Sequence, residues 1–104
     1  MIKRSAILLN VLFFLCALYT QAQTNVKVMS YNIRLNVDSD GENKWELRKD
    51  KVAGLMNYYE PDFIGGQEVT HTQLEYLVKN LNGYSYIGVG RDDGKTKGEY
   101  SCIF

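Results

Sequence analysis

The sequence predicts a mixed fold, either α/β or α+β, for the part of the chain that follows residue 22. Two observations lead to this prediction. Short segments rich in Val, Ile, Tyr and Phe read as strands, and longer segments with apolar residues at helical spacing separate them. Along the chain, the expected order is strand, helix, strand, helix, strand, strand. Such an order typically packs helices against a sheet.

The first 22 residues are expected to be a cleaved signal peptide, and residues 23–104 are expected to form the domain. The segment has a charged start, an apolar stretch over residues 6–18 and a small-residue pattern at Thr20-Gln21-Ala22 that suits signal peptidase. The apolar stretch is shorter than the roughly 20 residues that a membrane-spanning helix needs. A retained membrane anchor and a lipoprotein anchor at Cys16 are the alternatives. The expected location is secreted or periplasmic, without a stable membrane anchor after cleavage.

Composition narrows the possible partners. Removal of residues 1–22 leaves 10 basic and 12 acidic side chains, a net charge of −2. Nucleic-acid-binding proteins usually carry clustered Lys and Arg, and this balance gives no such footprint. Only Cys102 remains after cleavage, so no internal disulfide is possible. About 82 residues support at best a marginal single core, and the sequence leaves the oligomeric state open.

The first predicted elements are a strand over residues 26–35, a turn-rich loop over 36–44 and a helix over 45–59. The helix places five apolar side chains near one face: Trp45, Val52, Leu55, Met56 and Tyr59. Pro61 ends this helix and starts a second strand over 62–67, because the residue before a proline disfavours helical geometry.

A second helix follows, with Thr70 as its N-cap and Gly83 suited to the left-handed position after the helix end. Its expected buried residues are Leu74, Leu77, Val78 and Leu81. A third strand over 84–89, a polar loop over 90–98 and a fourth strand over 99–104 complete the chain. The last strand has no continuation and leaves a sheet edge and an apolar face uncovered. The chain therefore reads as the front part of a larger domain.

Two polar side chains stand at the ends of neighbouring predicted strands. Asn32 follows the alternating segment that begins at Val26, and Glu68 ends the apolar run that begins at Asp62. Hard cations such as Mg²⁺ take oxygen ligands, usually one or two carboxylates with waters and substrate phosphate oxygens. Glu68 is the candidate metal ligand, and Asn32 is its candidate companion in the metal and phosphate shell. The alternative is structural: Glu68 caps the following helix and Asn32 hydrogen-bonds a loop.

The chain resembles the endonuclease/exonuclease/phosphatase superfamily in two motifs, Val28-Met29-Ser30-Tyr31-Asn32-Ile33-Arg34 and Asp62-Phe63-Ile64-Gly65-Gly66-Gln67-Glu68-Val69. In that family the strand Asn and the Glu of the Gln-Glu pair belong to the metal and phosphate site. Arg48 in the helix between the motifs and Gln73-Leu74 after the second motif also fit the family. The segments 88–94 and 98–104 resemble its secreted bacterial branch, so the similarity spans the chain after residue 22.

The resemblance implies the N-terminal part of a four-layer α/β/β/α sandwich, here incomplete. It also implies a metal-dependent hydrolase of phosphate esters, a phosphodiesterase, phosphatase or nuclease that uses Mg²⁺ or Mn²⁺. In that family the general base comes from later motifs, an Asp-x-Asn segment and a terminal Asp-His pair, which this chain lacks. His71 is expected to be a solvent-exposed residue at a helix start. The chain alone is therefore expected to be almost inactive, and a non-enzymatic secreted fragment or small binding module is the alternative.

Two further residues bear on the substrate, whose identity stays open. Arg34 stands where apurinic endonuclease members of the family usually carry an acid, which favours a secreted phosphatase or phosphodiesterase over DNA repair. Arg91 is expected at the loop-bearing end of the third strand, either bound to phosphate oxygens or paired with Asp92, Asp93 or Glu99. Glu99 is expected to start the fourth strand or to bind Arg91, with a direct metal role as the alternative.

Three other motifs fail on spacing. Gly94-Lys95-Thr96 lacks the first glycine of a P-loop and precedes a strand where that motif needs a helix. Gly88 and Gly90 would need a third glycine three positions later for a dinucleotide site. Residues 38–42 mimic a calcium loop, but the glycine comes two positions early and Lys49 stands at the bidentate acid position. A solvated loop, at most at the rim of the active site, is expected there.

Overall fold

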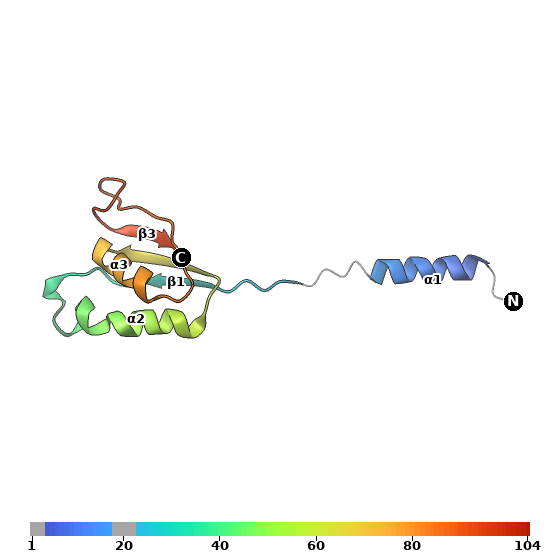
Figure 1. Cartoon of the computed structure of the whole chain (residues 1–104), viewed down its shortest axis with the longest axis horizontal. Helices are drawn as coiled ribbons and strands as arrows, with labels where there is room; N and C mark the ends of the chain where they lie inside the picture. Colours follow the sequence, from blue (N-terminus) through green and yellow to red (C-terminus); the bar gives the residue numbers. More distant parts are fainter. Residues whose placement is uncertain (1–3, 18–22) are drawn as a thin grey trace.

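The computed structural model describes residues 4–17 and 23–104 (Figure 1). Helix α1 (Arg4–Ala17) lies apart from the other elements, and its apolar side chains between Ala6 and Phe14 are exposed. The expected cleavage pattern at Thr20-Gln21-Ala22 falls outside the described residues. Within the described ranges, no helix combines the length and the apolar character needed to cross a membrane.

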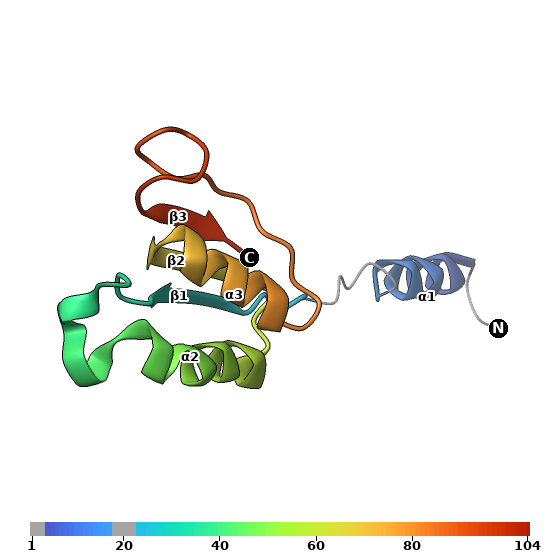
Figure 2. The same ribbon diagram turned by 60° about the vertical axis from the view of Figure 1, so that its left-hand side comes forward.

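Three strands form one sheet in the order β1-β2-β3. β1 (Val28–Asn32) and β2 (Phe63–Val69) are parallel, and β3 (Tyr100–Ile103) runs antiparallel to β2. Because β1 and β2 are parallel, their carboxyl ends meet at the same edge of the sheet (Figure 2). Asn32 pairs there in register with Gln67.

The connection from β1 to β2 consists of the 3₁₀ turn η1 (Asp38–Asn43) and the helix α2 (Trp45–Tyr59), and α3 (His71–Asn80) follows β2. Parallel neighbours need such a crossover. Both helices cover one face of the sheet (Figure 2) and share a single hydrophobic core with it. The core residues are Ile33, Trp45, Val52, Ala53, Met56, Ile64, Val69, Leu74, Leu77, Leu81, Tyr100, Cys102 and Phe104.

The opposite face of the sheet is open. Val28, Phe63 and Ile103, one from each strand, are 68%, 52% and 54% exposed. Val28 pairs with Phe63, and Gly65 pairs with Ile103, so these side chains lie on one continuous surface. We call this surface the open sheet face. One covered and one open face confirm the predicted mixed fold and match an incomplete sandwich.

One predicted strand is wrong. Residues 84–89 form no regular strand and make only an isolated bridge, in which Ile87 and Ile103 exchange two backbone hydrogen bonds of 2.9 Å. At Gly88 the φ is 153° and a β-carbon would lie 2.9 Å from the Cβ of Cys102, so the backbone passes β3 more closely than a residue with a side chain allows. The helix α2 has the predicted bounds, and α3 follows the predicted cap at Thr70. The other three strands are present, with ends shifted from the predicted positions.

Three side chains predicted to be buried are exposed. In α2, Leu55 and Tyr59 are 41% and 51% exposed because the buried stripe is centred on Met56 and includes Ala53. Leu55 lies on the flank of that stripe, and Tyr59 is the last residue of the helix. In α3, Val78 is 44% exposed, because the buried side of the helix carries Gln73, Leu74 and Leu77 instead. The orientation of α3 therefore places the side chain of Gln73 beside the candidate site.

Candidate metal and phosphate site

Asn32 and Glu68 lie together at the shared edge of β1 and β2. Asn32 is the last residue of β1, and Glu68 follows the residue that pairs with it. The Asn32 Nδ2 donates a hydrogen bond of 2.8 Å to Glu68 Oε1. The two residues singled out from the sequence are therefore direct neighbours.

The backbone at this edge is strained at two positions. Glu68 adopts φ 57° within the irregular β2–β3 pairing between Gly66 and Val69, and Arg34 adopts φ 62° just after β1. A left-handed conformation in a residue that carries a β-carbon costs of order 1–3 kcal/mol. Such strain persists only where the surrounding structure enforces it, and functional sites are where it is commonly found.

The turn after β1 fixes both oxygens of the Glu68 carboxylate. Asn32 Oδ1 accepts a hydrogen bond of 2.9 Å from the backbone N–H of Arg34, which tightens the turn. The next N–H, that of Leu35, donates to Glu68 Oε2 at 3.2 Å. Each carboxylate oxygen thus receives one donor and keeps a lone pair for a further partner.

These contacts keep Glu68 ionised. The pKa of Glu68 is lowered below its ordinary value of 4.5, mainly by the hydrogen bond from Asn32 and next by the one from the Leu35 N–H. Partial burial raises this pKa, and the nearby charge of Arg34 lowers it. A carboxylate that stays charged at neutral pH is what a divalent cation requires.

Two helices hold the turn that contains Arg34. Arg48 on α2 donates to the backbone oxygens of Ile33 and Arg34, the latter at 2.8 Å. Gln73 on α3 donates to the same oxygen of Arg34 at 2.8 Å and accepts from the N–H of Thr70 at 2.9 Å. Gln73 therefore ties the turn after β1 to the turn after β2. We call Arg48 and Gln73 the turn clamp.

From the sequence, Arg48 and Gln73 are recognised only as positions that fit the family, and no role is predicted for either side chain. A signal for Gln73 was present, because a Gln three residues after the N-cap Thr70 is the spacing of a capping box. Thr70, rather than Glu68, caps α3, so that part of the structural alternative is wrong. Its other part is present, because Asn32 hydrogen-bonds the turn after β1.

The loop over residues 38–42, whose sequence mimics a calcium site, binds an arginine side chain. Asp40 forms a bidentate ion pair with Arg34, with contacts of 2.6 Å to Nε and 2.8 Å to Nη2. The guanidinium of Arg34 lowers the pKa of Asp40, and the carboxylate of Asp40 raises the pKa of Arg34. The loop thus lies beside the candidate site and holds Arg34 in place.

Arg91 and His71 do not join the Asn32–Glu68 pair by any hydrogen bond in the described part of the chain. Arg91 Nη1 donates to Glu99 Oε2 at 2.9 Å, which is the ion-pair alternative considered for it. His71 begins α3 as expected, but its ring is only 41% exposed, because it stacks on Tyr100 and places Nδ1 3.0 Å from the Tyr100 hydroxyl.

The residues at the strand ends fit part of a hard-cation site. Among residues 4–17 and 23–104, no three His, Cys, Asp or Glu side chains cluster closely enough to hold a metal ion. A Mg²⁺ site in proteins, however, needs only one or two carboxylates, with waters and phosphate oxygens supplying the rest. Glu68 provides one carboxylate with free lone pairs, and Asn32 orients it. The donor set is suited to Mg²⁺ or Mn²⁺ rather than to a soft metal.

Fold and site together define the class of protein. Two parallel strands present an Asn and a Glu at one edge, under two helices that cover one sheet face. The chain corresponds to an N-terminal portion of an endonuclease/exonuclease/phosphatase domain, which confirms the resemblance read from the sequence.

Three solved structures from Bacteroides species are similar to the chain in sequence and in fold. The chain is 45% identical to the endonuclease/exonuclease/phosphatase from Bacteroides vulgatus, with a TM-score of 0.76 over 79% of this chain and 31% of that one. It is 44% identical to the mannosyl-6-phosphatase from Bacteroides thetaiotaomicron, with a TM-score of 0.73 over 77% of this chain and 31% of that one. A further family protein from Bacteroides thetaiotaomicron is 43% identical, with a TM-score of 0.75 over 81% and 32%.

The chain thus spans about 31% of the length of the structures it matches. Comparisons with protein-family models and with curated proteins give no match.

Proposed function

We propose that the chain is part of a metal-dependent hydrolase of phosphate esters, in which Glu68 and Asn32 contribute to the metal and phosphate site. The 2.8 Å hydrogen bond between these two side chains at the shared strand edge carries the proposal. A charged carboxylate held by two donors at rigid strand ends is suited to fixing a hard cation. The similarity to endonuclease/exonuclease/phosphatase proteins supports the phosphoesterase class.

Each residue has a defined part in this proposal. When bound, Mg²⁺ or Mn²⁺ would neutralise charge on the non-bridging phosphate oxygens and activate a water for in-line attack. Glu68 would hold the cation through the lone pairs that its two donors leave free. Asn32 and the N–H of Leu35 would keep the carboxylate in one orientation, so that little reorganisation is needed on binding.

Phosphate esters of small alcohols are the proposed substrates. One similar structure bears the name mannosyl-6-phosphatase, which describes hydrolysis of a sugar phosphate by that protein. The net charge of −2 after residue 22 argues against a nucleic-acid substrate, because nucleic-acid sites rely on clustered basic residues.

We also propose that residues 1–22 direct export, so that the protein is secreted or periplasmic. The exposed apolar helix α1 supports this proposal, because an isolated apolar helix is the form expected of a signal segment. Export from the native host should yield an N-terminus at Gln23 by mass spectrometry, and retention of residues 1–22 would contradict cleavage.

The function is tested with a chimera, because the chain spans about 31% of the Bacteroides vulgatus structure. Residues 23–104 replace the matched segment of that protein, and hydrolysis of p-nitrophenyl phosphate is measured with Mg²⁺. We expect metal-dependent turnover in the chimera. Glu68→Gln keeps the size of the side chain but removes its charge, so kcat/KM should fall at least about 100-fold.

The control variant is Glu42→Gln, which makes the same change on the exposed turn η1. It should retain full turnover. Undiminished activity of Glu68→Gln would remove Glu68 from the metal site, and a folded chimera without Mg²⁺-dependent turnover would reject the proposed function for this segment.

A further inference from the structure

A cavity of about 410 Å³ lies next to the candidate site. Its lining includes Leu35, His71, Thr72, Arg91, Thr96 and Glu99. Leu35 joins the two places, because its N–H donates to Glu68 while the residue itself lines the cavity. The Nδ2 of Asn36, the next residue, donates to the hydroxyl of Thr72 at 3.4 Å, so the turn after β1 forms one wall. The cavity therefore borders the turn whose backbone binds the Glu68 carboxylate.

The wall opposite the turn belongs to a loop that its own contacts hold in shape. Asp93 Oδ1 accepts hydrogen bonds from the backbone N–H groups of Lys95 and Lys97 at 2.8 and 3.0 Å. At Gly98, with φ 81°, a β-carbon would lie 2.5 Å from the Asp92 carboxyl group. Side chains at Gly90 and Gly98 would therefore collide with the loop over residues 90–98 itself.

A second set of contacts fixes this loop to the rest of the domain. The Tyr100 hydroxyl donates to the backbone oxygen of Lys95 at 2.9 Å and lies 3.0 Å from His71 Nδ1. Tyr100 itself is buried on β3. The Tyr100 hydroxyl therefore links the loop over residues 90–98 to β3 and to the start of α3. These contacts hold the walls of the cavity in place before any ligand binds.

The exposed lining of the cavity is mainly apolar and carries a few side-chain donors and acceptors, which suits a neutral ligand that has both C–H surface and hydroxyl groups. Arg91 is paired with Glu99 at 2.9 Å and with Asp92 at 3.6 Å, so its positive charge is compensated within the wall. A compensated guanidinium is a weak site for a second phosphate but still offers N–H donors, and Glu99 offers acceptors. The hydroxyls of Thr72 and Thr96 both donate and accept. Sugar hydroxyls need such mixed partners.

We propose that this cavity binds the polyhydroxylated alcohol part, a sugar, of the phosphate ester, with Arg91, Thr96 and Glu99 as specificity-determining residues. The proposal rests on the proposed function, because it places the phosphoryl group at Glu68 and Asn32. It assigns Arg91 to the alcohol rather than to the phosphate.

The test uses the full chain with Mg²⁺ and three probes: mannose 6-phosphate, inorganic phosphate and methyl α-mannoside. Binding is followed by amide NMR shifts. Mannose 6-phosphate should shift the amides of residues 33–35 and of residues 96–99, whereas inorganic phosphate should shift only the first group. Methyl α-mannoside at high concentration should shift only the second group.

Two substitutions separate the sugar from the phosphate. Thr96→Val is close in shape and should weaken mannose 6-phosphate about 3- to 10-fold, the effect of one lost hydrogen bond. Arg91→Gln should weaken it about 10-fold or more, because hydrogen bonds from charged groups are stronger. Neither variant should change the affinity for inorganic phosphate or Mg²⁺. Thr24→Val, an exposed residue before β1, is the matched control and should change nothing.

Equal weakening of mannose 6-phosphate and inorganic phosphate by Arg91→Gln would overturn the proposal, because Arg91 would then be a phosphate ligand. Unmoved amides over residues 96–99 with both sugar probes would also overturn it. Failure of the proposed function looks different: neither phosphate probe would shift residues 33–35, and Glu68→Gln would leave Mg²⁺ affinity unchanged. In that case the response of residues 96–99 to methyl α-mannoside still decides whether the cavity binds a sugar.

Discussion

Glu68 keeps its charge because two N–H donors and a nearby guanidinium favour the ionised carboxylate. The pKa values of Asp40 and Asp93 are lowered as well. Asp40 is bound by the guanidinium of Arg34, and Asp93 accepts hydrogen bonds from backbone N–H groups of its own loop. At the residue scale, the site and its surroundings are therefore organised by hydrogen-bonded carboxylates. Each of these groups links folding to pH.

The sign of that linkage gives a prediction. A carboxyl whose pKa is lower in the folded chain stabilises the fold above its ordinary pKa, and the contribution is lost as pH falls through the folded value. The free energy of unfolding should thus decrease from pH 4.5 downward, the ordinary pKa of Glu68. Urea unfolding across this range should show a shallower decrease for Glu68→Gln, which has no proton to bind. Equal slopes for both proteins would mean that Glu68 has no favourable contacts in the fold.

At the scale of elements, α2 and α3 act on the site through the backbone of one turn. Arg48 and Gln73 both donate to the carbonyl oxygen of Arg34, and Gln73 also holds the N–H of Thr70. Because Arg34 and Glu68 are strained, the two turns would relax without such support. The helices thus support the turns that carry Asn32 and Glu68 through backbone carbonyl and N–H groups.

Gln73→Leu tests this role of the helices. The change leaves the part-buried N–H of Thr70 without its partner and should lower the free energy of unfolding by about 1–3 kcal/mol in urea titrations. It should also weaken Mn²⁺ binding by about 10-fold, the lower end of effects seen for groups that orient metal ligands. Val78→Thr, an exposed change on the same helix, should stay within about 0.5 kcal/mol. Unchanged Mn²⁺ affinity in a destabilised Gln73→Leu would limit Gln73 to a structural role.

Sequence reasoning found the elements whose signals are local. The Thr70 cap, the proline after α2 and the apolar strands around Asn32 and Glu68 all act within a few residues, and each element is present. Residues 84–89 have the composition of a strand, but they pair with β3 only at the bridge between Ile87 and Ile103, a contact between distant parts of the chain that local composition does not predict. The buried position of Gln73 depends likewise on the carbonyl of Arg34, 39 residues away.

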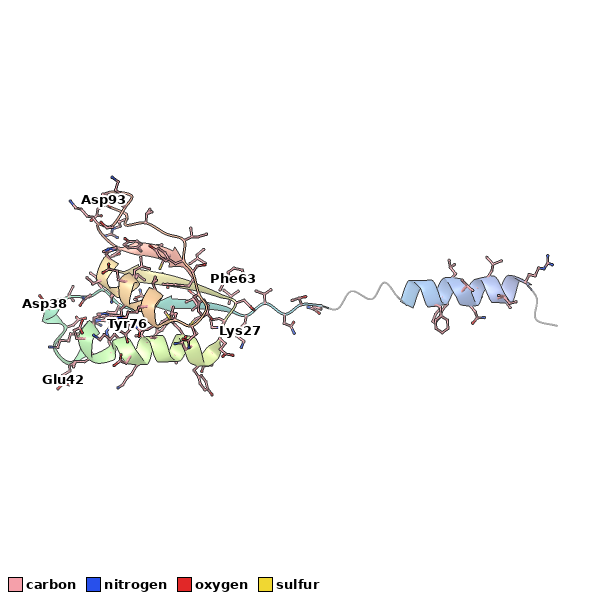
Figure 3. All side chains as sticks on the ribbon, viewed as in Figure 1. Lys27, Asp38, Glu42, Phe63, Tyr76 and Asp93 are labelled. Carbon is pink, nitrogen blue, oxygen red and sulfur yellow. The ribbon has the colours of Figure 1, made fainter. Side chains whose placement is uncertain are left out.

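At the scale of the whole molecule, the open sheet face is an exposed apolar surface of residues 23–104. Val28, Phe63 and Ile103 expose more than half of their surface on one side of the sheet. Contiguous apolar surface of this kind favours association. Figure 3 labels Phe63, whose side chain points away from the ribbon.

We therefore expect residues 23–104, without the apolar helix α1, to self-associate with rising concentration in sedimentation velocity experiments. The double variant Phe63→Ser with Ile103→Thr should remain monomeric and keep most of its stability, because both side chains are already largely exposed. Leu47→Ser, an exposed change on α2 away from the sheet, should associate like the unmodified chain. Association that persists in the double variant would place the contact on another surface.

The central claim is that Glu68 and Asn32 form a cation site, and Mn²⁺ titration of the full chain followed by NMR tests it most directly. Paramagnetic broadening should begin at the amides of residues 32–35 and 67–69 and should disappear from these amides in Glu68→Gln. Broadening centred instead on the acidic turn η1, or broadening of residues 32–35 and 67–69 that Glu68→Gln leaves unchanged, would contradict the claim.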